Sequence, residues 1–227
     1  MNKKIDMADN IGFVELLGTF GDDLTVVNAA RVSFDKESTV LSENDKRLVT
    51  YLADHDHISP FFHPQIRLRI KMPLFVAREY FRHQIGLARN EVSRRYVDTV
   101  PECWIPSETD MRSRDTKVKQ GSKDTPIEES QTAHALLKQQ ILQACQAYQD
   151  LINMGVAPEV ARVVLPQSMY TLFCETGSLA AYARICNLRL DPTAQKEIRL
   201  FATAINELMS GAFPVAWAAL SKNFKQT

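Results

Sequence analysis

The residues best suited to chemistry lie close together between Tyr80 and Tyr96. This segment holds four arginines, a histidine, an acid, amides and a serine, and it has few apolar residues. Guanidinium groups present paired donors that match phosphate and planar carbonyl groups, and Ser93 with its backbone could complete a phosphate cradle. A solvated face with salt bridges from Glu79 or Glu91 would have the same composition. The residues alone leave both interpretations open.

A group of histidines suggests a second kind of chemistry. His55, His57 and His63 fall within nine residues, and His83 follows them. A metal-dependent hydrolase could use such ligands, but no acid-containing motif of the H-E-x-x-H type accompanies them. The four cysteines show no metal-type spacing, and we expect them to be reduced, buried thiols. We therefore predict no metal site.

The overall composition narrows the class of protein. With 227 residues, 45% hydrophobic and 24% charged, the chain suits a single globular domain. Basic and acidic side chains balance at 27 each, so we do not expect a nucleic-acid partner. No apolar run reaches the roughly 20 residues of a membrane helix. The first residues also lack the apolar region of a signal peptide, so a cytoplasmic location without membrane contact is expected.

Three elements are expected just before the chemical segment. Ser42 has the position of an N-cap and predicts a helix over 43–54. Strict alternation over 65–71 predicts a half-buried strand whose outer face is cationic. Pro73 can open a helix that continues to about residue 84. The chemical segment would then begin on this helix.

The rest of the chain is predicted to be mainly helical. Within 11–34 we expect a strand, a turn and then a further strand or a short helix. A long helix is expected over 127–153, ended by Gly155, followed by a short helix over 157–165 and a strand over 169–176. Two more helices are expected over 178–189 and 192–210, and Asp191 and Pro192 would open the second of them. Residues 106–126 contain almost no apolar side chains and are expected to form an exposed insertion. The class is α+β, in one domain over 1–227.

Five blocks of sequence resemble the flavin-dependent thymidylate synthases. They are His57-x-Ser-Pro-Phe with His63, the run PLFVAREYFRH, the Arg-His motif RHQ…NEVSRRY, the run VARVVLP that begins at Val160, and Asn187-Leu-Arg189. The blocks follow the family's order from about residue 45 to residue 210. One motif alone would be moderate evidence, whereas five in the same order are far more specific.

The chain also departs from the family pattern. Gln84 stands where the motif usually has arginine, and eight residues instead of seven separate it from Ser93. Ala180 and Arg184 stand where many relatives have an arginine and a histidine or asparagine. Arg184 is a candidate to supply the positive charge that Gln84 and Ala180 lack.

The resemblance implies an α+β fold with a central, mostly antiparallel sheet packed by helices. It implies a methyltransferase that converts dUMP to dTMP, with 5,10-methylenetetrahydrofolate as carbon donor and FAD reduced by NADPH. It further implies a homotetramer whose subunits share active sites. The unrelated class of thymidylate synthases needs a cysteine nucleophile, and no cysteine here lies in a cation-rich segment. The alternatives are a relative that binds dUMP without FAD, and a nucleotide- or RNA-end-binding module.

The resemblance also assigns roles to residues. The expected dUMP ligands are Glu79, Arg82, Glu91, Ser93, Arg94, Arg95, Arg162 and Arg189. The expected FAD ligands are His57, Ser59, Arg82, His83, Gln84, Glu91, Ser178 and Arg184, with folate as an alternative for His57. Arg189 is the expected catalytic residue, because its guanidinium would favour the electron-rich, N3-deprotonated uracil. Without the resemblance, Arg189 would be interpreted as an arginine that closes a helix C-terminus.

Arg162 is the clearest single candidate for a phosphate ligand. It lies in the apolar run VARVVL, where a buried cation would need a partner. A ligand phosphate would serve, and so would a salt bridge with Glu159 or Glu175.

Overall fold

A computed structural model describes residues 3–116, 121–222 and 224. The chain forms two compact units. The first unit contains the residues up to Ile70, then Tyr80–Asn90 and the residues from Phe173 onward. The second contains Lys71–Glu79 and Glu91–Leu172.

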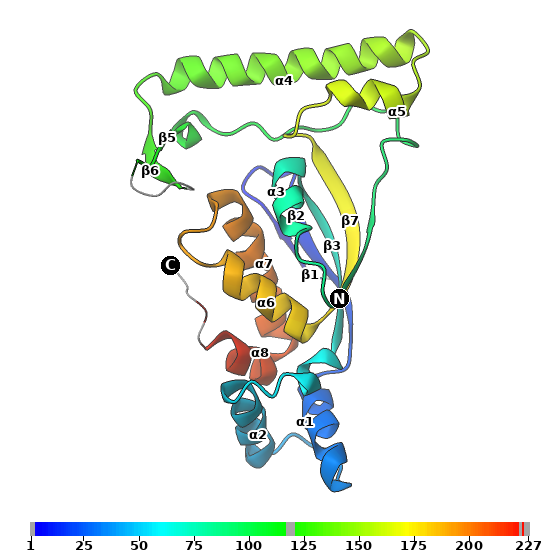
Figure 1. Ribbon diagram of the computed structural model, residues 1–227, viewed down its shortest axis with the longest axis vertical. Helices are drawn as coiled ribbons and strands as arrows, with labels where there is room; N and C mark the ends of the chain where they lie inside the picture. Colours follow the sequence, from blue (N-terminus) through cyan, green and yellow to red (C-terminus); the bar gives the residue numbers. More distant parts are fainter. Residues whose placement is uncertain (1–2, 117–120, 223, 225–227) are drawn as a thin grey trace. The chain divides into compact units, whose positions relative to one another are not determined.

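The structure contains a five-stranded sheet with the order β1-β2-β3-β7-β4. Its strands are β1 (Lys3–Asp6), β2 (Phe13–Phe20), β3 (Gln65–Pro73), β7 (Tyr170–Ser178) and β4 (Leu87–Glu91). Figure 1 labels β1, β2, β3 and β7 of this sheet. The sheet is mostly antiparallel, and β1 and β2 pair with Lys3 opposite Leu16. In β3, Ile66, Leu68 and Ile70 are buried, so the alternation predicted for 65–71 is confirmed.

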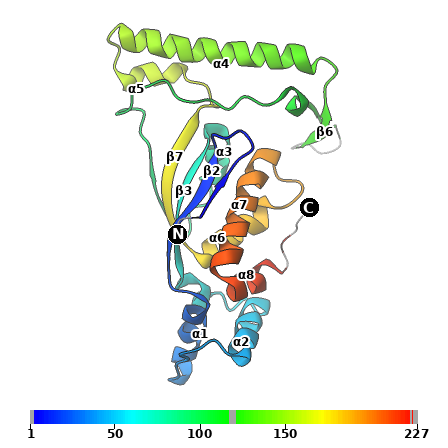
Figure 2. The ribbon, with the colours of Figure 1, turned by 180° about the vertical axis from the view of Figure 1, so that it is seen from behind.

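The first unit also contains helices. They are α1 (Asp23–Arg31), α2 (Glu43–Asp54), α6 (Leu179–Arg189), α7 (Lys196–Ala212) and α8 (Pro214–Ser221), with short 3-10 turns at Val32–Phe34 and Ser59–Phe62. Of these helices, α7 packs on the sheet, whereas α1 and α2 contact α8 and each other. α7 contacts β2, α6 and α8, as the view from behind also shows (Figure 2). Trp217, Tyr182, Ile205 and Phe213 are fully or almost fully buried, which places the core between these helices and the sheet.

Side-chain caps fix where two of these helices begin. Ser42 accepts from the N–H of Asp45 at 3.2 Å, and the Asp45 carboxylate accepts from the N–H of Ser42 at 2.9 Å. The predicted helix over 43–54 and its cap are therefore confirmed. Buried Asp23 caps a second helix, because its carboxylate accepts from the N–H groups of Val215 and Ala216 at the start of α8.

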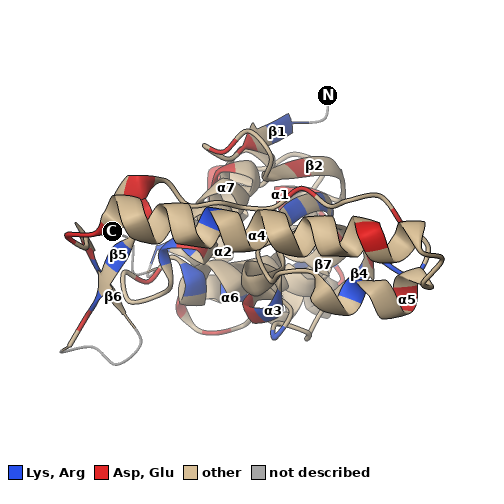
Figure 3. Ribbon diagram, turned by 90° about the horizontal axis from the view of Figure 1, so that it is seen from above, with Lys and Arg blue, Asp and Glu red and all other residues tan. Residues whose placement is uncertain are grey.

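The second unit is built around α4 (Ser130–Asn153), a long helix with few charged residues (Figure 3). It contacts α5 (Pro158–Ala161) and the 3-10 turns at Arg162–Val164 and Glu108–Asp110. Gly155 follows α4 with φ of +87°, which confirms it as the residue that ends the helix. The unit also contains α3 (Leu74–Tyr80), apart from the last residue of that helix.

The insertion predicted over 106–126 has some structure of its own. A two-stranded ribbon forms from β5 (Arg112–Arg114) and β6 (Ser122–Pro126), and β6 is exposed along its length. Residues 117–120, which belong to the same prediction, lie outside the described residues.

Two predicted helices are wrong at their ends. Instead of running from Pro73 to about residue 84, α3 covers only Leu74–Tyr80, and Pro73 is the last residue of β3. The last predicted helix starts at Lys196, because the Asp191 carboxylate accepts from the N–H of Thr193 at 2.9 Å and forms a separate turn.

Other elements were missing from the prediction or differ from it. β4 and α8 were not predicted. Within 11–34, the strand β2 is followed by the helix α1, so the helical alternative is correct. Of the four cysteines, only Cys186 is buried, and the other three are half-buried. No helix among the described residues combines the length and the apolar character needed to cross a membrane.

Candidate active site

A hydrogen bond between Arg189 and His83 marks the chemical centre of the first unit. Nε of Arg189, the last residue of α6, donates to Nε2 of His83 at 3.0 Å. His83 lies in the turn after α3 and is 8% exposed. Because Nε2 accepts this bond, the imidazole is neutral and carries its proton on Nδ1.

His83 is surrounded by positive charge, and we call this group the His83 cluster. Burial is the main cause that lowers the pKa of His83 to about 4. Four arginines lower it further, in the decreasing order Arg189, Arg184, Arg89 and Arg82. A histidine with this pKa remains neutral at pH 7, so the acceptor for Arg189 is maintained.

The turn before β4 is tied to the start of α6. Nη2 of Arg184 donates to the carbonyl of Ile85 at 2.7 Å. The N–H of Ser178 donates to the carbonyl of Gly86 at 3.2 Å, and the Ser178 hydroxyl caps α6 by accepting from the N–H of Ala181. Gly86 has φ of +76°, a conformation that glycine adopts without strain. These contacts place the residues after His83 in a defined conformation.

A buried ion pair lies next to this turn. Glu175 on β7 is fully buried, and its carboxylate accepts from Nε of Arg89 on β4. The Tyr80 hydroxyl donates to the other carboxylate oxygen of Glu175 at 2.7 Å. The Arg89 guanidinium lies over the rings of Tyr80 and Phe81, 5.2 and 5.1 Å from their centroids.

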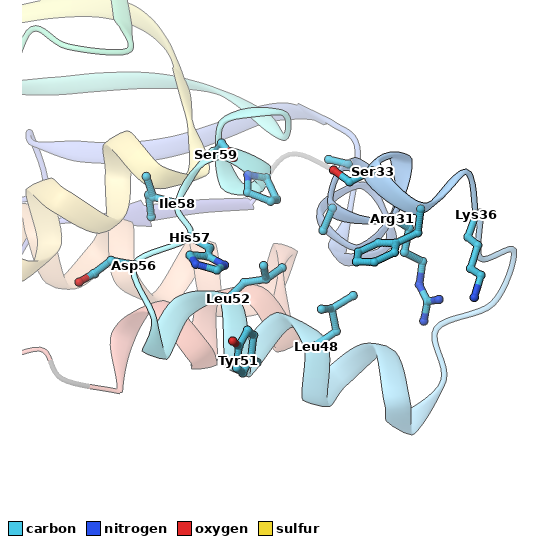
Figure 4. A pocket seen from close by; sticks show the side chains of 14 residues that line it. Arg31, Ser33, Lys36, Leu48, Tyr51, Leu52, Asp56, His57, Ile58 and Ser59 are labelled. Carbon is cyan, nitrogen blue, oxygen red and sulfur yellow. The ribbon is translucent and has the colours of Figure 1, made fainter.

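A cavity of about 840 Å³ provides space for a ligand in the first unit (Figure 4). His57 and Ser59 line it, together with the aromatic side chains of Phe34 and Tyr51. Arg31 also lines it and pairs with Asp45 at 2.5 Å. A volume of this size is within the range of sites for cofactors and other small molecules.

A second basic group lies in the second unit, and we call it the Glu159 group. Nε of Arg95 is 3.4 Å from the Glu159 carboxylate, and Nε of Arg162 donates to the Glu159 carbonyl at 3.3 Å. The Ser93 hydroxyl accepts from the N–H of Arg95 at 3.3 Å, and Arg94 donates to a backbone carbonyl at 2.6 Å. Arg162 is exposed, so the expectation of a buried cation at this position is wrong.

The remaining predicted ligands lie at the end of β4, in α3 and in the turn after α3. Glu91, at the end of β4, accepts from the Thr171 hydroxyl at 2.5 Å. Glu79 is half-buried in α3. Arg82 and Gln84 are both exposed in the turn after α3.

The histidines of the metal alternative pack on an aromatic ring. The rings of His55 and Tyr51 are stacked with centroids 4.0 Å apart, and His57 contacts the same ring edge-on at 6.0 Å. In the described part of the chain, no group of three or more His, Cys, Asp or Glu side chains could hold a metal ion.

Comparison with known proteins assigns the family. A family model described as "Thymidylate synthase complementing protein" matches residues 15–215. The flavin-dependent thymidylate synthase of Kosmotoga olearia is 39% identical over 217 residues, which cover 95% of this chain and 92% of that protein. The chain belongs to the flavin-dependent thymidylate synthases. The family member of Thermus thermophilus is 40% identical over 212 residues, covering 93% of this chain and 76% of that protein.

A solved structure supports the same fold for this flavin-dependent thymidylate synthase. It is the UMP/dUMP methylase PolB from Streptomyces cacaoi bound with 5-Br dUMP. The TM-score is 0.83 at 26% identity, and the match covers 94% of this chain and 96% of that one. The predicted resemblance and the α+β fold are therefore confirmed.

The structure of this synthase gathers the predicted residues in three places. The His83 cluster contains Arg82, His83, Arg184 and Arg189, and Gln84 and Ser178 lie in or beside its turn. The cavity is lined by His57 and Ser59. The other predicted ligands belong to the second unit: Glu79, Glu91, Ser93, Arg94, Arg95 and Arg162. Arg162 donates to the backbone carbonyl of Glu159, which is not the salt bridge with the Glu159 carboxylate that was considered from the sequence.

The sequence did not identify two parts of this site. Arg89 and Glu175 were not assigned to it, although they lie beside His83 in the buried ion pair. Lysine and aromatic residues of the cavity wall, such as Lys36 and Tyr51, were also missed. A strand prediction for 87–91 would have placed Arg89 on a sheet. Its partner Glu175 is 86 residues away in the chain, so local sequence patterns could not have identified it.

Proposed function

We propose that this flavin-dependent thymidylate synthase methylates dUMP with Arg189 at the reacting base. In the overall reaction, dUMP, 5,10-methylenetetrahydrofolate, NADPH and a proton give dTMP, tetrahydrofolate and NADP+. The observation that carries the proposal is the hydrogen bond of 3.0 Å that fixes Arg189 on neutral His83.

Arg189 would act by electrostatic stabilisation. Its Nε–H donates to His83, which fixes the plane of the guanidinium, and we assign the guanidinium as the donor group that would face the uracil carbonyls. A guanidinium stays charged at all relevant pH values, and it therefore stabilises the N3-deprotonated ring without giving up a proton. His83 orients the guanidinium and, being neutral, adds no repulsion to it.

The first unit fits the chemical character of FAD. The anionic pyrophosphate of FAD suits the arginines of the His83 cluster, and its rings suit a cavity of about 840 Å³ with Phe34 and Tyr51 in the wall. The residues of this unit that would hold it are His57, Ser59, Arg82, His83, Gln84, Ser178 and Arg184, and the resemblance also assigns Glu91 of the second unit to FAD. Bound there, the flavin supplies the hydride chemistry, and NADPH renews it.

The dUMP phosphate and sugar are assigned mainly to the second unit. The expected ligands in this unit are Glu79, Glu91, Ser93, Arg94, Arg95 and Arg162. The family resemblance also assigns Arg82 and Arg189, which belong to the first unit, to dUMP. Arg95 and Arg162 are exposed, and both contact Glu159. A phosphate that offers two oxygens to these guanidinium groups would replace a weak surface ion pair with charge-assisted hydrogen bonds. Ser93 would be a ligand here, because no base is present to activate it as a nucleophile.

We infer a homotetramer in the cytoplasm, with active sites that combine residues of different subunits. Exposed apolar side chains support association, since Phe20, Val32, Phe34 and Val40 are each more than 70% exposed. Folate would bind beside the flavin, and His57 is a candidate for contact with either molecule.

The test is dTMP formation by purified protein. The protein is incubated with dUMP, 5,10-methylenetetrahydrofolate, FAD and NADPH, each component is omitted in turn, and dTMP is detected by mass spectrometry. We expect the product to vanish when any one of them is left out. UMP should be offered in parallel, because PolB, the structural neighbour, is described as a UMP/dUMP methylase.

The outcomes separate the alternatives. Product that needs all four components supports the proposed reaction. A protein that binds dUMP but gives no dTMP under any condition would contradict it and favour a nucleotide-binding relative.

A further inference from the structure

The segment between Gln84 and Ser93 contains an arginine whose surroundings are unusual. Arg89 lies on β4, and its side chain is 14% exposed. Its Nε donates to Glu175 on β7, the neighbouring strand, and Glu175 is fully buried. Nη2 of Arg89 is also buried and has no hydrogen-bond partner among the described residues. A buried arginine with one nitrogen left unpaired calls for a role beyond packing.

Tyr80 connects this ion pair to the catalytic centre. Its hydroxyl donates to Glu175 at 2.7 Å, and its ring lies under the Arg89 guanidinium. The edge of the same ring approaches His83, with ring centroids 6.3 Å apart. Tyr80 is 1% exposed, so it cannot move without disturbing both neighbours.

Charged and titratable side chains near His83 come from several elements, and the Glu175 carboxylate on β7 faces Arg89 and Tyr80. Arg184 and Arg189 project from α6, Arg82 lies in the turn, Arg89 lies on β4, and Tyr80 ends α3. A fully buried carboxylate, that of Glu175, fixes Arg89 in place. Gln84 is exposed in the same turn and brings no charge.

We propose that Arg89 is a positioning residue of this site: clamped by Glu175 and Tyr80, it holds a fixed positive charge beside His83 and so maintains the His83–Arg189 hydrogen bond. The inference rests on the proposed role of Arg189, but it concerns a property of His83 that can be measured without turnover.

The charge and the packing of this pair can be separated by mutation. Arg89→Met alone would leave the buried Glu175 carboxylate without a counter-charge, which is strongly destabilising. The double variant Arg89→Met/Glu175→Gln removes both charges and keeps the shapes, so it should unfold at nearly the temperature of the unaltered protein. The matched control is Arg69→Met/Glu15→Gln, which neutralises an ion pair between β3 and β2 of the same sheet.

The readout is the pKa of His83 in the full chain without FAD. It is measured by NMR titration of isotope-labelled histidine, and the His83 signal is identified as the one that His83→Gln lacks. We expect the pKa of His83 to rise in the double variant and to stay unchanged in the control. FAD affinity, followed by flavin fluorescence, should fall about tenfold in the double variant, because His83, an expected FAD ligand, would no longer be held in place.

Adding Gln84→Arg to the double variant tests the origin of the charge. The new arginine should lower the pKa of His83 again, toward the value of the unaltered protein. A folded double variant whose His83 pKa and FAD affinity both match the unaltered protein would overturn the proposal, since the pair would then be structural only.

Arg89→Lys covers the case in which the double variant does not fold. It keeps the charge but not the planar fork, so the pKa of His83 should stay low. A rise to the ordinary histidine value in folded Arg89→Lys would overturn the proposal. Failure to form dTMP in the unaltered protein would instead count against the proposed function, because the titration needs no turnover.

Discussion

The two basic regions of this synthase differ in how their arginines are held. In the His83 cluster, Arg189 is bound to a buried imidazole, and Arg89 is bound to a fully buried carboxylate. In the Glu159 group, Arg95 and Arg162 are exposed and share one exposed glutamate. The first region is organised before any ligand arrives, whereas the second can exchange its contacts for those of a ligand. Such a difference is expected if one region acts on the reacting base and the other binds phosphate.

The largest expected effect is the loss of turnover in Arg189→Ala. The variant lacks the fixed cation at the uracil ring, so kcat should fall by about a hundredfold to a thousandfold or more. FAD should remain bound, because Arg189 is not among its proposed ligands. Steady-state dTMP formation and flavin absorbance measure the two properties separately. Near-normal kcat in this variant would remove Arg189 from the mechanism.

Arg95→Ala and Arg162→Ala should change substrate binding more than kcat. Each removes a charge-assisted contact to phosphate, and the KM for dUMP should rise about tenfold to a hundredfold. Because both arginines contact Glu159, the effects of the two substitutions should not add in the double variant. Lys138→Ala on α4 is a control that changes charge in the same unit. A pure loss of kcat with unchanged KM would contradict this assignment.

The pH dependence of stability should also distinguish the regions. The pKa of His83 is about 4 in the folded protein and about 6.5 in the unfolded chain, so the unfolded state binds the proton more readily. The contribution of neutral His83 is fully present above about pH 6.5 and is lost as the pH falls toward 4. His83→Gln keeps an acceptor for Arg189 but does not titrate. Urea unfolding between pH 4 and 7 should show a weaker pH dependence in that variant, and identical curves would count against a neutral, buried His83.

The smallest effect is expected outside both regions. Ser42→Ala removes the cap of α2 and should lower the free energy of unfolding by about 1 kcal/mol. Neither kcat nor the KM for dUMP should change. A kinetic change would mean that stability alone alters the site, and the kinetic effects of the arginine variants would then need correction for it.

The fold could be predicted from sequence where local chemistry determines it. The Ser42 cap and the alternation in β3 depend on residues within a few positions of each other, and both are confirmed. The end of α3 is different. Its first N–H groups donate to the carbonyls of Met169 and Gln167, about 95 residues later in the chain, and Tyr80 is held by Glu175. Such distant partners decide where this helix starts and ends, and no local pattern records them.

The site could be predicted only in part for the same reason. The family motifs identified Arg189 and His83, because motif residues are recognised by type and spacing. Their hydrogen bond joins residues 106 positions apart and required the fold. Glu175 was considered only as a possible partner of Arg162, because local sequence cannot show that an acid inside a strand pairs with Arg89 on another strand.

A crystal structure of the protein with dUMP bound would test the division between the two regions most directly. We expect the uracil ring to lie within hydrogen-bond distance of the Arg189 guanidinium, with Nε of Arg189 still bound to His83. The phosphate should contact Arg95 and Arg162, contributed by the same or another subunit. A uracil ring that contacts neither Arg189 nor any other residue of the His83 cluster would contradict the proposed mechanism.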